Sequence, residues 1–319
     1  MFEKISSKLS VFTTAAALTG ATLPAADAQG GLMVNVANYD QHKLLSADPM
    51  YKNSVAVGRV GSIGLTYASG VLIAPDVYIN SGHFTPINGS TVAFHTEIVF
   101  GENYNTSTER YSVKETQRFP GYVFGNKGTI DLGVGWTDQF VAGITSPGDL
   151  PYFAPPSSSV PEGTVLTLVD YGIYGDENTG QLPSLGDRLA GRAPKDNDSI
   201  DYSSTYYYAT LFDGSTSLDI LNYRGDDFAS GAAWYTELGA VSGLHIASSN
   251  NVGIGVSIVL DLTHPDIQAY LQPIIQDSWA RFYASQEPVN PGNPALPEPS
   301  TVALLATAGL LLGKRPKKS

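Results

Sequence analysis

Three residues that can act together as a proton relay lie far apart in the 319-residue chain: His83, Asp131 and Ser230. A serine hydroxyl is a weak nucleophile until a neighbouring imidazole accepts its proton. A carboxylate bonded to the other ring nitrogen fixes the tautomer of the imidazole and stabilises its charged form. If folding brings the three side chains together, they could perform acyl transfer, with Ser230 as nucleophile, His83 as general base and Asp131 as the orienting acid.

Each of these residues taken alone has an ordinary structural explanation. A single histidine is more often a hydrogen-bonded core residue, a single aspartate often caps a turn, and serines are common in loops. Asp131, however, lies within the apolar stretch GTIDLGVGWT of residues 128–137. Burying a carboxylate is costly unless it is hydrogen-bonded, so Asp131 needs a designated partner, and an N–H of His83 would supply it.

The segments around these residues resemble the trypsin-like serine proteases. Residues 68–84 read ASGVLIAPDVYINSGHF, in which Gly82-His83 matches the family's Ala-Gly-His step with Ser in place of Ala. Residues 128–137 are similar to its Asp-Ile-Ala-Leu step, and SGAAW from Ser230, followed by SGLH from Ser242, is similar to its nucleophile loop and the next strand. Chymotrypsin-type enzymes also share the order His, Asp, Ser, which other triad folds permute.

This resemblance, which covers about residues 53–285, implies an all-β fold of two antiparallel six-stranded barrels with a C-terminal α-helix. The first barrel would supply His83 and Asp131, and the second Ser230. The implied activity is endopeptidase hydrolysis of protein or peptide substrates through an acyl-enzyme, without metal or cofactor. The resemblance also implies roles for further residues. The backbone N–H groups of Phe228 and Ser230 would face the oxyanion. Arg224 would form the floor of the primary pocket and favour acidic side chains, and Ile246, Ala247 and Ser248 would pair with the substrate backbone.

The nucleophile loop departs from the family pattern and leaves two alignments open. Phe228 stands where the family has a glycine, and a bulky residue resists positive φ. Ala229 replaces the aspartate that receives the new N-terminus in animal members. In the second alignment, Asp227 occupies the nucleophile position and cannot perform acyl transfer. That alignment predicts a catalytically degraded protease fold acting as an envelope binding or structural protein.

Both ends of the chain have the composition of sorting signals. Residues 1–28 combine two lysines, a short apolar run and Ala-Asp-Ala, which is typical of a secretory signal peptide. Residues 297–319 combine Pro-Glu-Pro, an apolar segment shorter than the roughly 20 residues that span a bilayer, and a basic end. They resemble the PEP-CTERM signal of bacteria, which the membrane enzyme exosortase removes. An exported protein of the bacterial cell envelope or extracellular space is therefore expected, with transient membrane association through the tail.

Composition narrows the class of protein further. The chain has no cysteine, which excludes disulfides and thiolate metal sites. Its formal net charge is -12 at a sequence pI of about 4.7, and loss of the tail with its four positive charges would bring the charge to about -16. Phosphate backbones repel such a surface, so nucleic acid is an unfavourable partner.

Hydrophobic patterns predict the order of the elements. Short segments rich in Val, Ile, Tyr and Thr, separated by turn residues, indicate antiparallel strands. Apolar residues at helical spacing predict a helix over residues 264–285 that packs on the second barrel, with Pro273 bending or dividing it. The expected organisation is a signal peptide, an N-terminal arm, a first barrel, a second barrel with the helix, a proline-rich linker and the sorting signal, at residues 1–28, 29–52, 53–150, 151–285, 286–299 and 297–319.

Overall fold

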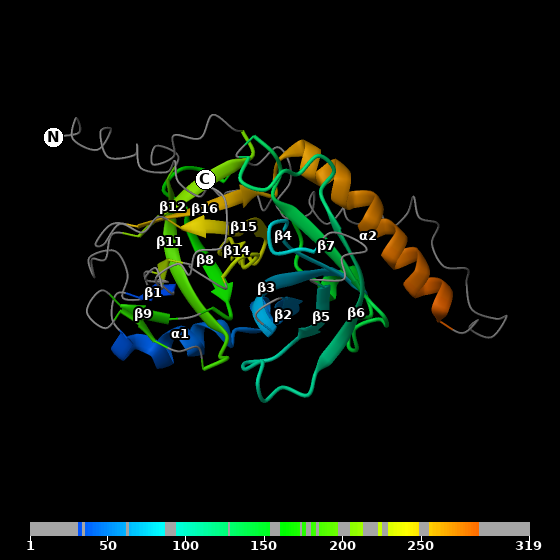
Figure 1. Ribbon diagram of the computed structural model, residues 1–319, viewed down its shortest axis with the longest axis horizontal. Coiled ribbons are helices and arrows are strands. Elements are labelled where there is room, and N and C mark those ends of the chain that lie inside the picture. The colour runs from blue at the N-terminus through cyan, green and yellow to red at the C-terminus, as the bar shows by residue number, and fades with distance from the viewer. Residues whose placement is uncertain are drawn as a thin grey trace, which may run out of the picture.

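The described residues form two closed antiparallel barrels of six strands each, which confirms the predicted fold class (Figure 1). The computed structural model describes residues 31–33, 36–61, 64–86, 94–126, 128–153, 160–172, 174–176, 180–182, 185–196, 205–212, 223–224, 229–248 and 255–286. The first barrel contains β2 (Ser54–Gly61), β3 (Gly64–Ala74), β4 (Val77–Ser81), β5 (Phe94–Val99), β6 (Arg110–Arg118) and β7 (Leu132–Thr137). The second contains β8 (Val165–Asp170), β11 (Leu189–Asp196), β12 (Tyr207–Phe212), β14 (Ala233–Tyr235), β15 (Val241–Ser248) and β16 (Gly255–Asp261).

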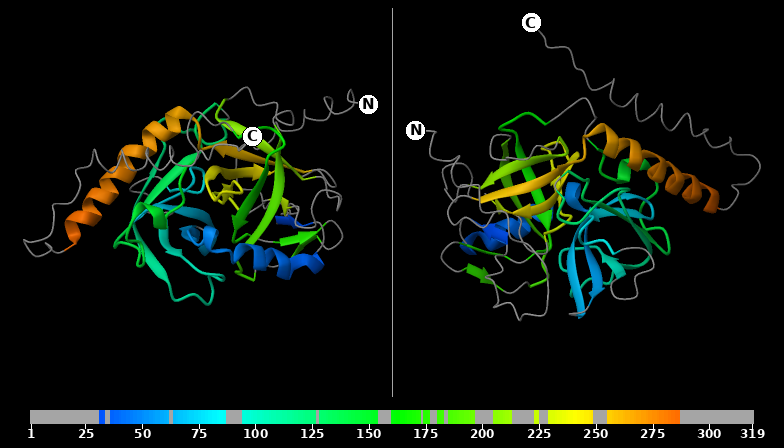
Figure 2. Two further views of the ribbon diagram at one scale, coloured as in Figure 1. Left: turned by 180° about the vertical axis from the view of Figure 1, so that it is seen from behind. Right: turned by 45° about the horizontal axis from the view of Figure 1, so that its top comes forward.

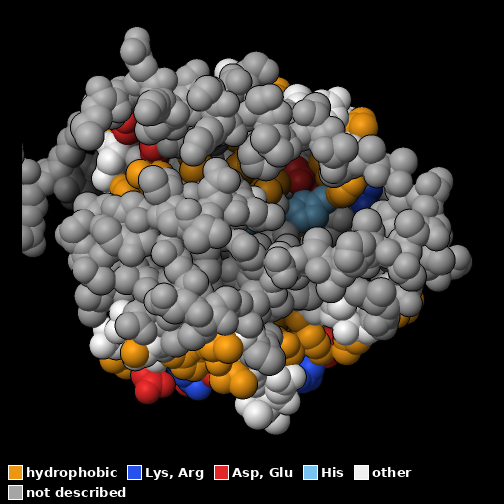
Figure 3. Space-filling view, turned by 60° about the vertical axis from the view of Figure 1, so that its left-hand side comes forward, with side chains coloured by type: hydrophobic (Ala, Val, Ile, Leu, Met, Phe, Trp, Pro, Cys, Tyr) orange, Lys and Arg blue, Asp and Glu red, His pale blue; other side chains and the backbone are white. Residues whose placement is uncertain are grey.

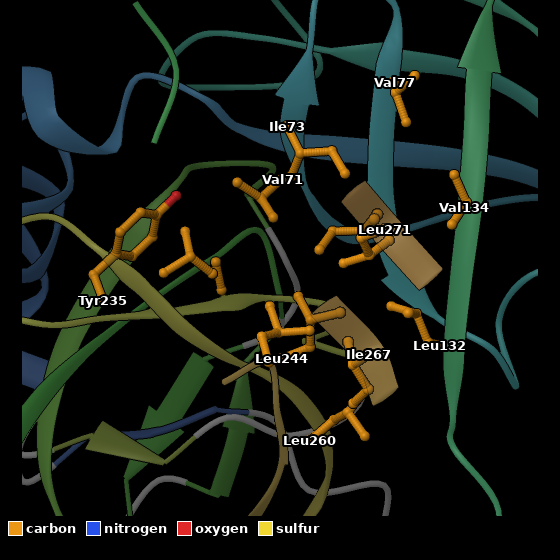
Figure 4. Close-up of a cluster of buried hydrophobic side chains, with 14 of the residues drawn as sticks. Val71, Ile73, Val77, Leu132, Val134, Tyr235, Leu244, Leu260, Ile267 and Leu271 are labelled. Atoms are coloured by element: carbon orange, nitrogen blue, oxygen red, sulfur yellow. The ribbon is translucent and has the colours of Figure 1, made fainter. Parts of the chain in front are cut away.

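The two barrels share a hydrophobic core where they meet. Figure 4 shows this cluster, in which side chains of the first barrel such as Val71 and Leu132 face side chains of the second such as Leu244 and Leu260. All four are fully buried. Because apolar burial is the main favourable term in folding, this shared core holds the barrels in one relative position. Residues carried by different barrels therefore keep a fixed geometry.

The C-terminal helix α2 (Pro265–Ser285) is continuous through Pro273, so the predicted helix is confirmed and is not divided. It packs differently from the expectation, however. Its first turns add Ile267 and Leu271 to the cluster between the barrels, and its last turns add Trp279 and Phe282 to the core of the first barrel. The helix therefore meets the second barrel through its first turns, and the rest of it lies on the first barrel, as Figure 2 also shows from two further sides.

A buried polar contact fixes α2 on the first barrel. Asp76 lies in the turn between β3 and β4 and is 3% exposed. Its carboxylate accepts a hydrogen bond from Ser278 and forms an ion pair with Arg281. A buried carboxylate without these donors would be strongly destabilising, which selects this surface for the helix. No helix within the described ranges is both long and apolar enough to cross a bilayer.

A small four-stranded sheet joins the N-terminal arm to the segment that precedes Ser230. Its strand order is β10 (Gly180–Leu182), β9 (Tyr174–Asp176), β1 (Gly31–Met33) and β13 (Tyr223–Arg224). In β1, Leu32 pairs with Arg224 on one side and with Gly175 on the other. The arm is thus part of the fold on the side of the second barrel, next to the approach to the nucleophile loop.

Helix α1 (Tyr39–Ser46) lies along β11, and its fully buried side chains make polar contacts there. The fully buried His42 and Ser46 bond to the carbonyl oxygens of Ala190 and Arg188, each at 2.7 Å. Apolar side chains of the same region remain at the surface, including Leu44 at 75% exposure. Figure 3, which brings the side of the second barrel forward, shows hydrophobic side chains along its lower edge. Hydrogen bonds to the barrel therefore hold this helix together with the apolar packing of the partly buried Leu45 and Tyr39.

His95, on β5, gives folding stability a defined dependence on pH. Its Nε2 lies 3.3 Å from the carbonyl oxygen of Phe84, which can only accept, so Nδ1 accepts from the Tyr78 hydroxyl at 2.6 Å. Both ring nitrogens are thereby satisfied in the neutral form. Burial lowers the pKa of His95 from 6.5 to about 3, and the charge of Arg59 acts in the same direction.

We expect this histidine to destabilise the fold as the pH falls from about 6.5 towards 3, because the unfolded chain then binds a proton that the folded chain does not. Between pH 7 and pH 5 the loss amounts to about 2 kcal/mol. Urea unfolding at both pH values would measure it. His95→Gln retains hydrogen-bonding groups but does not titrate, so its stability should fall by about 2 kcal/mol less. An equal fall in both proteins would contradict the prediction.

Candidate active site

His83, Asp131 and Ser230 meet at the junction of the two barrels. Nδ1 of His83 lies 2.8 Å from Oδ2 of Asp131, and Nε2 lies 2.9 Å from Oγ of Ser230. Because a carboxylate only accepts, Nδ1 carries the ring hydrogen and Nε2 is free to accept from the serine hydroxyl. The histidine side chain is 24% exposed and that of Asp131 only 11%. The carboxylate is therefore shielded from water, while the imidazole is partly exposed to solvent.

The backbone around His83 fits closely against Asp131. Oδ1 of Asp131 accepts the backbone N–H of His83 at 2.7 Å, so the carboxylate holds both the main chain and the ring of the histidine. A Cβ atom on Gly82 would lie 2.9 Å from that same Oδ1, closer than normal contact allows. This explains the Gly-His step in physical terms: a side chain at position 82 would push the carboxylate away from the imidazole.

The loop that carries Ser230 is fixed against both barrels. The backbone oxygen of Ser230 accepts the N–H of Ser69 from β3 at 3.2 Å. Gly231 donates its N–H to the carbonyl oxygen of His245 at 2.8 Å and has φ +85, where a Cβ would lie 2.5 Å from the oxygen of Ser69. Only glycine meets both demands. Within the described residues the N–H of Ser230 has no acceptor, so it is available to a developing negative charge.

Tyr207 is a member of this site that sequence reasoning missed. It extends from β12 of the second barrel, donates its hydroxyl to the carbonyl oxygen of Thr129 at 2.6 Å and accepts the N–H of Asp131 at 3.1 Å. One phenol thus holds the chain on both sides of Ile130 and fixes Asp131 from the opposite barrel. No sequence pattern indicates this role, because Tyr207 is one of three consecutive tyrosines in a strand pattern.

If the site performs the acyl transfer that its residue types predict, Tyr207→Phe should lower kcat about tenfold with little change in KM, because losing one or two buried hydrogen bonds costs about 1–2 kcal/mol of positioning energy. Steady-state hydrolysis of a peptide substrate would measure it. Tyr206→Phe is the matched control, since the hydroxyl of Tyr206 reaches the exposed Asp266 on α2 rather than the site. Equal kinetics of Tyr207→Phe and the natural chain would contradict the role.

The other residues expected at the site are placed only in part. Phe228 and Asp227 lie outside the described residues. Arg224 lies in β13, where its backbone pairs with Leu32 of β1, and its side chain is not described. The expected roles of Phe228, Asp227 and Arg224 therefore stay predictions.

Ile246, Ala247 and Ser248 form the end of β15, beyond the part that pairs with β14. The pairing of β15 with β14 ends at Leu244, whereas Ala247 and Ser248 still pair with β16. Within the described residues, no strand covers the other edge of Ile246–Ser248. The edge at Ile246 and Ala247 has the hydrogen-bonding groups to receive an extended peptide.

Comparison with known proteins gives a distant likeness. No family model matches the chain, and no curated protein matches it. A solved structure described as a Glu endopeptidase in complex with MPD matches with 16% identity and a TM-score of 0.49, covering 72% of this chain and 94% of that one. The hydrogen-bonded geometry of His83, Asp131 and Ser230 is a feature of this chain itself. Among the described residues no group of three His, Asp or Glu side chains could hold a metal ion.

Proposed function

We propose that this protein is a serine endopeptidase with His83, Asp131 and Ser230 as its catalytic residues. The observation that carries the proposal is the unbroken hydrogen-bonded line from Asp131 through His83 to the Ser230 hydroxyl, built from two barrels. A serine beyond hydrogen-bond reach of the imidazole would have favoured a degraded protease fold. The distance of 2.9 Å instead favours an active enzyme.

In the proposed reaction, Nε2 of His83 takes the hydroxyl proton of Ser230 while Oγ forms a bond to the scissile carbonyl carbon. The charge that develops on the carbonyl oxygen is stabilised by the N–H of Ser230 and, as the resemblance implies, by that of Phe228. His83 then gives the proton to the leaving nitrogen as the C–N bond breaks. Water repeats the sequence on the acyl-enzyme and releases the acid. Asp131 keeps its negative charge throughout and stabilises the imidazolium.

The substrate would bind as an added strand along Ile246, Ala247 and Ser248. The open edge of β15 supports this mode, since an extended peptide there gains backbone hydrogen bonds regardless of its side chains. Arg224 remains our candidate for the floor of the primary pocket, where a guanidinium would favour an acidic side chain before the scissile bond.

Labelling with a fluorophosphonate probe tests the proposal directly. The probe reacts only with a serine whose hydroxyl is activated, so the natural chain should be labelled and the label should map to Ser230 by peptide mass spectrometry. His83→Ala should lose the labelling, because no general base remains. A folded natural chain that takes no label would overturn the enzyme and leave a peptide-binding or structural envelope protein.

We also propose that the protein is exported and carries a C-terminal sorting signal. The tripartite composition of residues 1–28 and the Pro-Glu-Pro, apolar and basic segments of residues 297–319 support this, and both lie outside the described residues. Mass spectrometry of the protein recovered from bacterial cells tests it. A first residue at Gln29 and a tail lost after Pro299 are expected, whereas an intact Met1 in envelope fractions would contradict export through this signal.

A further inference from the structure

Two arginines flank the segment that follows His83. The guanidinium of Arg59, from β2, lies 5.3 Å from the centre of the Phe84 ring. Arg118, at the end of β6, donates from Nε to the carbonyl oxygen of Thr85 at 2.6 Å and lies 5.6 Å from the ring centre of Tyr122. Phe84 and Thr85, the two residues directly after the histidine, are therefore each in contact with one guanidinium group.

Neither arginine has a carboxylate partner within the part of the chain that the structure describes. Arg110 pairs with Glu97 at 2.8 Å and Arg281 pairs with Asp76, but Arg59 and Arg118 form no ion pair there. Acids outnumber basic residues by 30 to 18 in this chain, so partners are not scarce.

Arg59 in particular is held at a cost. Its Nε is buried and has no hydrogen-bond partner among the described residues. Burial, and then the neighbouring charge of Arg118, lower its pKa. The repulsion between two neighbouring, partly buried positive charges is unfavourable unless a bound anion offsets it. The two terminal nitrogens of Arg59 are not buried and form no hydrogen bond among the described residues, so they offer a planar fork that matches a carboxylate.

The chemistry of the site indicates which part of a substrate would reach this pair. In the proposed reaction, His83 gives its proton to the leaving nitrogen, so the departing peptide begins at the imidazole. Because His83 belongs to the first barrel, we expect the residues that follow the scissile bond to lie beside that barrel. Phe84 and Thr85 are the next residues of that barrel, and they carry the two guanidinium groups.

We propose that Arg59 and Arg118 form an anion subsite that binds acidic side chains on the leaving-group side of a peptide substrate. This subsite rests on the proposed endopeptidase function and adds to it a preference after the scissile bond. It is separate from the pocket for the residue before that bond, where Arg224 is the candidate.

Cleavage mapping and paired substrates test the subsite. The natural chain digests a denatured protein mixture, mass spectrometry gives the best-cleaved sequence, and two versions of that peptide are made with Glu or Gln at the second or third position after the cut. We expect kcat/KM to be about tenfold higher for the Glu peptide at low ionic strength, and the ratio to approach one at about 0.5 M salt. Arg59→Gln should reduce the low-salt ratio to about one, while Arg59→Lys should retain part of it.

Two controls separate this role from a general effect on the fold. Arg110→Gln removes a paired arginine of the same barrel and should leave the Glu to Gln ratio unchanged. Arg118→Gln should lower the Glu to Gln ratio as Arg59→Gln does. If it does not fold, Arg118→Lys, which keeps the charge but not the fork, replaces it and should retain part of the ratio. Equal cleavage of both peptides by a natural chain that takes the fluorophosphonate label would overturn the subsite and leave the endopeptidase standing. A chain that neither takes the label nor cleaves would overturn both.

Discussion

Replacing Ser230 by alanine is expected to reduce kcat for peptide hydrolysis by about 10⁵ to 10⁶-fold, with KM nearly unchanged. The physical reason is that the alanine methyl cannot form the acyl-enzyme, while the binding surface remains. Hydrolysis of the best-cleaved peptide would be followed by mass spectrometry over hours, because the residual rate is low. Some rate above that in water should persist, since oxyanion donors and substrate binding still act.

A matched control guards against an unrelated loss of folding. Ser112→Ala changes an exposed serine on β6, and its kcat should equal that of the natural chain. Ser230→Ala should also retain the cooperative unfolding of the natural chain. If Ser230→Ala hydrolysed peptide at an unchanged rate, a group other than Ser230 would be the nucleophile, and the role proposed for Ser230 would fail.

Asp131→Asn is expected to lower kcat by about 10⁴-fold. The amide nitrogen of asparagine can donate to Nδ1 of His83, which would shift the ring hydrogen to Nε2, and a protonated Nε2 cannot accept the hydroxyl proton of Ser230. Discontinuous assays of peptide hydrolysis at neutral pH would measure the loss of kcat. The effect should appear in kcat rather than KM, because Asp131 is shielded and touches the imidazole instead of the substrate.

The control for this variant is Asp138→Asn, which removes an exposed carboxylate just after β7. It should keep full activity, because it removes one negative charge, as Asp131→Asn does, but leaves the relay intact. A loss of only a few-fold in Asp131→Asn would mean that the hydrogen bond to Nδ1 does not set the tautomer, and the role assigned to the carboxylate would fail. Thermal unfolding of both variants would show whether each remains folded at the assay temperature.

Local sequence patterns predicted the strands and the C-terminal helix. The hairpin of β3 and β4 follows from an apolar run broken at Pro75-Asp76, and α2 follows from the helical spacing of its apolar residues. The meeting of His83, Asp131 and Ser230 could be expected only through the resemblance to a family, since no local pattern encodes contacts across two barrels.

Contacts between residues far apart in the chain could not be predicted from the sequence. Asp76 reaches α2 across more than 200 positions, and nothing in the turn around it predicts that the helix lies on the first barrel. Tyr207 and the pairing of Leu32 with Arg224 are similar cases. Strands as short as β1 and β13 contain too few residues to display an alternation, so their pairing depends on the tertiary structure around them.

The shared core between the barrels also determines how the molecule can fail. Val71 and Leu132 of the first barrel are buried against Leu244 and Leu260 of the second. Separating the barrels would therefore expose a large apolar surface to water. If the chain were cut between the two barrels, each fragment would be inactive and prone to aggregate rather than stably folded. Heat should accordingly end activity and structure in a single step, with no milder stage at which the halves drift apart and later rejoin.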